Sequence, residues 1–191
     1  MTDDFDCHPL TPDRFGALEA LFATDGVTRD CWCMYWRVRA KDWKAGSGSA
    51  RHRAFRDRIE VGPPPGVLAY RSGEAVGWVQ VTPRSDVPRF NGARSAKPNA
   101  QDTDLDQTWA ISCFFLRKDV RRQGLMTDLA RAACAFAAER GAQAVEAAPI
   151  APRRPLIWGE GYVGITSALQ RAGFSTIEQR TELRTLMRWT P

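Results

Sequence analysis

The feature that most constrains the fold of this sequence is an apolar strand that leads through a short polar turn into an amphipathic helix. Residues 109–116 are apolar on both alternating faces, which is typical of a central strand covered on both sides. A helix with one apolar face is predicted from about Gly124 to Gly141, and an apolar strand at 142–148 follows it. A strand–helix–strand unit of this kind places its two strands in parallel.

Helices and a hairpin precede this unit. Pro12 is typical of a first helical turn, and Gly26 is expected to close that first helical region. A second helix is predicted at 49–59. Strands at 67–70 and 75–81 flank a turn and are predicted to form a hairpin.

The remaining segments are less regular in pattern. Residues 31–37 are rich in aromatics and indicate a strand or a loop with anchoring side chains, whereas residues 83–107 are polar and indicate a long loop. A short helix is predicted at 165–171, and two closing strands at 175–179 and 183–189.

The composition agrees with one globular domain over residues 1–191. The chain is 43% hydrophobic and 26% charged, and its 191 residues can bury a substantial core. We therefore predict a single α/β domain in which a mixed central sheet carries helices on both faces. The acidic N-terminus lacks the apolar core of a secretory signal, and no apolar run approaches the ~20 residues of a membrane span. A cytoplasmic protein without a membrane partner is expected.

Charge and cysteine content narrow the class of partners. The net charge is +5, but the excess is mostly scattered arginine, which does not favour a nucleic-acid platform. Five cysteines without a secretory signal argue against a disulfide framework. Cys31 and Cys33 form a CxC pair, yet His8 and His52 are the only histidines, so free thiols are expected and no metal site.

The turn before Gly124 carries the chemistry. The first N–H groups of a helix lack intrahelical partners and lie at the positive end of the helix dipole, which suits a pyrophosphate. Gly124 allows a ligand to approach the backbone, Arg121 and Arg122 add positive charge, and Thr127 adds a hydroxyl donor. A plain strand-to-helix turn with surface arginines is the alternative. The segment matches neither the P-loop nor the GxGxxG dinucleotide pattern.

The pattern Arg121-x-x-Gly124-x-Met126 resembles the acyl-CoA signature of the GNAT acyltransferase superfamily. The segment at 168–174, which ends in Gly-Phe, resembles a short helix of that family, and the hairpin and closing strands match it in order. The resemblance spans roughly residues 67–189 and the earlier helices more loosely.

The resemblance implies a GNAT-like fold in which the parallel strands at 109–116 and 142–148 splay apart around an acyl-CoA, acetyl-CoA being favoured. Backbone groups of the first strand would pair with the pantetheine arm and stabilise the oxyanion. A deprotonated primary amine of a small molecule would attack the thioester directly. The residues implied in cofactor binding are Phe114, Phe115, Leu116, Arg121, Arg122, Gln123, Gly124, Leu125, Met126 and Thr127.

The sequence departs from the family pattern in three places. Met126 replaces the usual small residue, which would set the helix start further from the phosphates. The tyrosine that often acts as general acid is replaced by Leu169, and Tyr162 is the candidate to substitute for it. A usual base position falls at Ala110, which cannot act. Residues 31–37 look like a block in an uncharacterised bacterial branch of the superfamily.

Two side chains are the catalytic candidates. Glu146 lies in a largely apolar strand, where desolvation would make its carboxylate a better general base; alternatively it faces solvent or pairs with an arginine. Tyr162 would protonate the departing thiolate; alternatively it is a surface loop residue. Cys113 has no nearby histidine and is expected to pack in the core. Trp43 and Trp158 are candidate walls of an acceptor pocket.

Other functions stay open from the sequence alone. A non-catalytic acyl-CoA-binding or sensing module would explain the missing tyrosine and the uncertain base. Transfer to a protein amine or to an aminoacyl-tRNA has only the basic pI, about 9.2, in its favour. A homodimer is compatible with the sequence.

Overall fold

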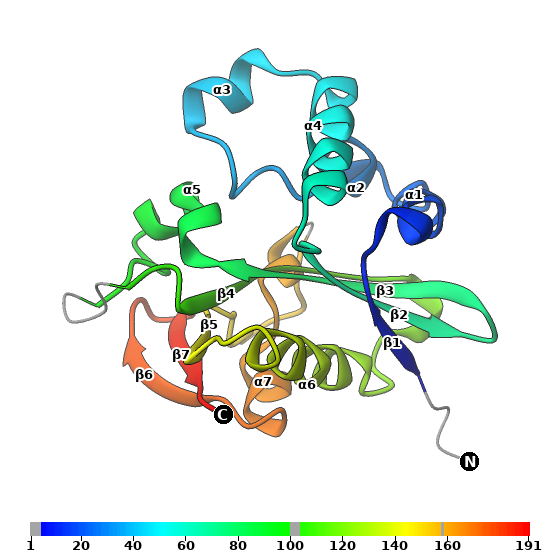
Figure 1. The fold of residues 1–191 in the computed structure, drawn as a ribbon. Coiled ribbons are helices and arrows are strands. Elements are labelled where there is room, and N and C mark those ends of the chain that lie inside the picture. Colours follow the sequence, from blue (N-terminus) through cyan, green and yellow to red (C-terminus); the bar gives the residue numbers. More distant parts are fainter. Residues whose placement is uncertain (1–4, 100–103, 158) are drawn as a thin grey trace.

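The computed structural model describes residues 5–99, 104–157 and 159–191. Its strands form one sheet in the order β1-β2-β3-β4-β5-β7-β6 (Figure 1). The strand bounds are β1 Asp6–Pro9, β2 Gly66–Arg71, β3 Glu74–Pro83, β4 Thr108–Leu116, β5 Ala144–Ala147, β6 Ser175–Gln179 and β7 Thr185–Trp189. Neighbouring strands are antiparallel except β4 and β5, which are parallel as predicted.

Helices cover both faces of this sheet, which confirms the predicted architecture. In Figure 1, α1 and α4 lie on one side of the sheet and α6 and α7 on the other. The α-helices are α1 Phe15–Phe22, α2 Gly26–Cys31, α3 Ala40–Ala45, α4 Gly48–Val61, α5 Pro88–Gly92, α6 Leu125–Ala138 and α7 Thr166–Arg171. Short 3-10 turns are η1 Pro12–Arg14, η2 Arg84–Asp86, η3 Lys118–Val120 and η4 Glu160–Val163.

Strand β4 supplies side chains to the cores on both faces. Phe114 packs in the core with Leu129 of α6, whereas Phe115 packs in the opposite core with Phe55 of α4. This division follows from the alternation of side chains along a strand. Because β4 is covered on both faces, its backbone is firmly held in the middle of the molecule.

The parallel pair β4–β5 is short, so part of β4 has a free edge at the candidate site. The register runs from Thr108 opposite Ala144 to Ile111 opposite Ala147, where β5 ends. Strand β4 continues to Leu116, so its edge toward β5 has no strand partner beyond Ile111 among the described residues. The predicted parting of the two strands is therefore present in the register.

A bulge lies where the strands part. Gln80 and Val81 are consecutive on β3, but they face Cys113 and Ile111 of β4. Ser112 therefore has no opposite residue on β3, which is the pattern of a β-bulge. The first unpaired residue on the β5 side is thus also the bulged residue on the β3 side.

Several predicted boundaries were wrong. Gly26 opens α2 and does not close a helix, because Asp25 caps that helix by accepting from the Val27 N–H at 2.9 Å. Residues 32–37 form turns, which confirms the loop and not the strand of the two alternatives, and Trp32 has a left-handed φ of 48°. The long polar loop contains η2 and α5, and β1 was missed.

None of the helices in the described part of the chain is both long and apolar enough to span a bilayer.

Candidate functional site

The turn that leads into α6 is built around a left-handed glycine. Gly124 has φ of +91° and occupies the N-cap position of α6. A side chain at this position would meet no atom closer than the Asp128 carboxylate at 4.0 Å, so the backbone conformation, not space, requires glycine. The helix N-terminus is consequently uncovered on the Gly124 side, and its dipole favours an anion there.

Side chains of the turn fasten it to the end of β4. Arg121 donates from Nε to the Leu116 carbonyl at 2.9 Å. Gln123 donates to the Asp119 carbonyl at 2.8 Å and accepts from Arg71 at 2.5 Å. These contacts hold a guanidinium beside the free end of the strand.

Three residues of the expected pyrophosphate set make other contacts. The Thr127 hydroxyl is buried and donates to the Ala168 carbonyl of α7 at 3.1 Å, so its hydrogen is engaged there in this structure. Leu125 is buried on the face of α6 that packs against the sheet, and its side chain lies close to Gly77 of β3. The Met126 sulfur accepts from the Ile165 N–H at 3.3 Å, which directs this larger side chain toward the start of α7.

A pocket of about 200 Å³ lies beside this turn. Its lining joins the α1–α2 connection to the end of β4 and the following loop: Thr24, Asp25, Phe115, Arg117, Lys118, Asp119 and Arg121. Arg117 is paired with Asp119 at 2.7 Å and Glu74 at 3.0 Å. The end of β4 and the turn therefore border a hollow whose lining includes the cations Arg117, Lys118 and Arg121.

Tyr162 reaches the wall of this pocket from η4. Its hydroxyl donates to Asp25 Oδ1 at 3.1 Å, and its ring centroid lies 6.3 Å from that of Phe115. Burial raises the pKa of the Tyr162 phenol, and the Asp25 carboxylate raises it further. The phenol is therefore protonated at neutral pH, and its hydrogen is held in the bond to Asp25. Asp25 was not recognised in the sequence, where only its capping position was a signal.

Glu146 does not have the surroundings of a free general base. Its side chain is fully buried, with Oε2 2.5 Å from Arg84 Nη1 and Oε1 2.6 Å from Arg188 Nη2. Arg84 also donates to the Ala96 carbonyl. Both carboxylate oxygens are held by guanidinium groups, so proton uptake would break two ion pairs in the interior. The predicted base is instead an anchor between β5, β7 and the segment after β3.

The thiols singled out in the sequence are free, and Cys33 and Cys113 lie against the sheet. Trp78 donates from Nε1 to the buried Cys33 sulfur at 3.2 Å. Burial is the main cause that raises the pKa of Cys31 to about 12, and the pKa of Cys113 is also well raised, first by its contact with Cys33. Such thiols are poor nucleophiles. Trp43 packs against Tyr35 with ring centroids 5.3 Å apart, and Trp158 lies outside the described residues.

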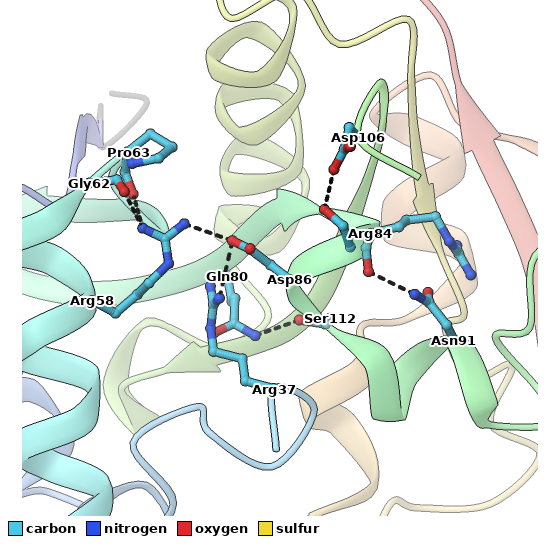
Figure 2. Close-up of polar contacts among 11 residues, drawn as sticks. Arg37, Arg58, Gly62, Pro63, Gln80, Arg84, Asp86, Asn91, Asp106 and Ser112 are labelled. Atoms are coloured by element: carbon cyan, nitrogen blue, oxygen red, sulfur yellow. Dashed lines mark hydrogen bonds and ion pairs between the residues drawn. The ribbon is translucent and has the colours of Figure 1, made fainter. Parts of the chain in front are cut away.

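A polar network missed in the sequence lies between α4, the segment after β3 and the strands (Figure 2). It includes Arg37, Arg58 and Asp86, and it reaches Gln80 and Ser112 in the strands. The only sequence signal was the position of Arg37 at the end of the aromatic block at 31–37.

Comparison with known proteins agrees with this geometry. Residues 31–157 match the Acetyltransferase (GNAT) family. No curated protein sequence matches the chain. The aminoglycoside acetyltransferase AAC(6')-Ib in complex with coenzyme A has a TM-score of 0.57 and 13% identity, covering 98% of this chain and 95% of that one.

Two further solved structures are similar over almost the whole chain. The GNAT domain of S. lividans PAT has a TM-score of 0.53 and 16% identity, covering 97% of this chain and 89% of that one. The ribosomal-protein-alanine N-acetyltransferase from Brucella melitensis has a TM-score of 0.54 and 17% identity, covering 97% and 99%. At these identities the likeness shows a shared fold.

Proposed function

This chain belongs to the acetyltransferase (GNAT) family, and we propose that it transfers an acetyl group from acetyl-CoA to a primary amine of a small molecule. The observation that carries the proposal is that an unpaired strand edge and a helix N-terminus follow each other along the chain. The unpaired edge of β4 beyond Ile111 leads directly to the Gly124 turn and the start of α6. The Arg121–Leu116 bond joins them.

The unpaired edge suits the pantetheine arm. An amide-bearing chain can add to a free strand edge through main-chain hydrogen bonds. Phe114, Phe115 and Leu116 are the residues of β4 that would pair with it, and β3 holds them from the opposite side. The pyrophosphate would then lie against residues 121–126, with Arg121 and Arg122 supplying charge and Gly124 leaving the backbone accessible.

Transfer needs only positioning and proton donation in this arrangement. The amine nitrogen forms a bond to the thioester carbonyl carbon, the carbon–sulfur bond breaks, and the thiolate of CoA leaves. Backbone N–H groups of β4 near the bulge would stabilise the oxyanion. Tyr162 would give its proton to the thiolate, and the amine would lose its extra proton to water, because Glu146 is occupied by arginines.

The class of acceptor is supported by the comparisons and not fixed by them. One similar structure is an aminoglycoside acetyltransferase in complex with coenzyme A and kanamycin, and another is a ribosomal-protein-alanine N-acetyltransferase. We favour a small-molecule amine on the likeness to the aminoglycoside acetyltransferase in complex with coenzyme A and kanamycin. The cytoplasm as the location and a homodimer as the assembly stay predictions.

Thermal unfolding with acetyl-CoA tests the donor site. A ligand at 100 times its Kd stabilises the folded state by about 2.7 kcal/mol, so a clear rise in Tm is expected. ADP is the control, because it has the diphosphate without the pantetheine arm and should raise Tm less. Absence of protection by acetyl-CoA would contradict the proposed site.

Release of free CoA thiol, followed across a panel of primary amines, tests the reaction. Thiol should appear only when both enzyme and amine are present. Protection by acetyl-CoA without thiol release from any amine would favour the sensing module. Turnover with peptide N-termini alone would favour a protein acceptor.

A further inference from the structure

A chain of side-chain hydrogen bonds runs from Arg37 through Gln80 to Ser112 (Figure 2). Arg37 donates from Nε to Gln80 Oε1 at 3.1 Å. Gln80 then donates from Nε2 to Ser112 Oγ at 2.6 Å. Gln80 is fully buried and Ser112 is almost fully buried, so the contacts are shielded from water and strengthened.

The chain ends at the position that matters for acyl transfer. Ser112 is the bulged residue of β4 and the first one beyond the last pair with β5. Under the proposed function, the thioester carbonyl lies where these two strands part. The side-chain relay and the reacting group therefore meet at the same bulge from opposite sides.

Arg37 determines which way the Gln80 amide faces. A guanidinium has only donors, so the amide oxygen must face Arg37 and the amide NH₂ must face Ser112. Without Arg37 the amide can flip, and its oxygen would then face the Ser112 oxygen. The Ser112 hydroxyl accepts from Gln80 and keeps its own hydrogen for another acceptor.

The ion pair with Asp86 does not by itself explain why the Arg37 guanidinium is buried here. The Arg37 side chain is 6% exposed, and its carboxylate partner Asp86, at 3.4 Å, is shared with Arg58 at 2.7 Å. Arg37 Nη2 is buried and has no hydrogen-bond partner among the residues that the structure describes. Burial lowers the pKa of Arg37 to about 10, a value at which the group is still charged at neutral pH.

Resting on the proposed function, we propose that Arg37 is a positioning residue for acyl transfer. Through Gln80 it fixes the side chain of Ser112, and with it the bulge of β4 whose backbone N–H groups polarise the thioester carbonyl. Arg58 shares Asp86 with Arg37, but within the described residues its hydrogen bonds go to Gly62, Pro63 and Asp86, so it stands outside the relay.

The infrared carbonyl stretch of bound acetyl-CoA, labelled with ¹³C at the carbonyl, measures this polarisation without turnover. In the wild type the stretch should move to lower frequency on binding. Arg37→Met should lose this shift and lower kcat about 10-fold or more, with the KM for acetyl-CoA unchanged. Arg37→Lys keeps a donor toward Gln80 and should restore part of both. Arg58→Met is the matched control and should retain both.

A second variant covers the case in which Arg37→Met does not fold. Ser112→Ala removes the far end of the relay and leaves the Arg37, Arg58 and Asp86 cluster intact, and it should lose the same carbonyl shift. A shift retained in Ser112→Ala or in folded Arg37→Met would overturn the relay, as would an equal loss in Arg58→Met. If acetyl-CoA does not bind the wild type at all, the proposed function fails; binding with unchanged carbonyl shifts overturns the relay alone.

Discussion

The Tyr162 hydroxyl donates to Asp25 Oδ1 at 3.1 Å, so a residue after β5 is joined to the N-cap of α2. The same carboxylate oxygen accepts from the Val27 N–H at 2.9 Å. The two residues are 137 positions apart in the sequence. Their hydrogen bond joins η4 to the connection between α1 and α2 at the pocket beside Phe115, and it sets the position of the phenol.

Removal of the phenol hydroxyl is expected to slow the chemical step. Tyr162→Phe should lower kcat about 100-fold, the lower end of the effect of a general acid, with the KM for acetyl-CoA nearly unchanged. Steady-state kinetics by thiol release measures both. Tyr70→Phe is the control, because Tyr70 is also partly buried but lies on β2. Equal rates in Tyr162→Phe and wild type would exclude the proton-donor role.

The pH dependence of kcat is expected to respond to Asp25. Burial and the Asp25 charge both raise the pKa of Tyr162, so the alkaline loss of activity should lie above the ordinary tyrosine value of about 10. Asp25→Asn removes the charge but keeps an oxygen for the cap, so the phenol pKa falls and the alkaline limb should move down by about one pH unit. Asp119→Asn, which changes another acid of the pocket, should leave the limb in place. An unmoved limb in Asp25→Asn would show that Tyr162 does not control it.

Gly124→Ala tests the turn before α6. A left-handed alanine costs about 1–2 kcal/mol, so Tm should fall by several degrees. The added methyl group would also meet the phosphates, and the Kd for acetyl-CoA should rise about 10-fold, which isothermal titration measures. Gly92→Ala is the matched control, because Gly92 lies in open space without a positive φ. Unchanged affinity in Gly124→Ala would place the pyrophosphate elsewhere.

Glu146→Gln is expected to reduce stability strongly. Removal of one partner from a buried ion pair costs about 3–5 kcal/mol, here because the buried guanidinium of Arg84 would lose its anion and the partly exposed Arg188 would lose its partner. Urea unfolding measures this loss. Glu182→Gln, in an exposed pair with Arg153, should cost less than about 1 kcal/mol. Full stability with a large loss of kcat would instead restore Glu146 as the general base.

The regular elements near the site could be predicted because their patterns are strong. The apolar run of β4, the apolar face of α6 and the Gly124 turn between them all appear where their periodicity indicated. Strand β1 was missed because Asp6–Pro9 has only four residues, which alternate between exposed and partly buried. Gly26 misled because a glycine also suits the start of a helix when an aspartate caps it.

The side-chain partners could not be predicted, because they come from distant parts of the chain. Nothing local to Glu146 reveals that Arg84 and Arg188 will hold it, and nothing local to Tyr162 points to Asp25. The backbone conformation around Gly124 depends on one short segment, so it could be predicted from the sequence. The cofactor-binding set and the single domain over 1–191 stay predictions.

The two-sided burial of β4 has a consequence for how such a protein can change over generations. Phe114 and Phe115 lock the strand into opposite cores, so a shift of the strand would disturb both at once. Substitutions in connecting segments such as 32–47 and 84–99, which lie outside the strands, leave both of these contacts in place. Packing thus restrains β4, while the connecting segments are freer to vary.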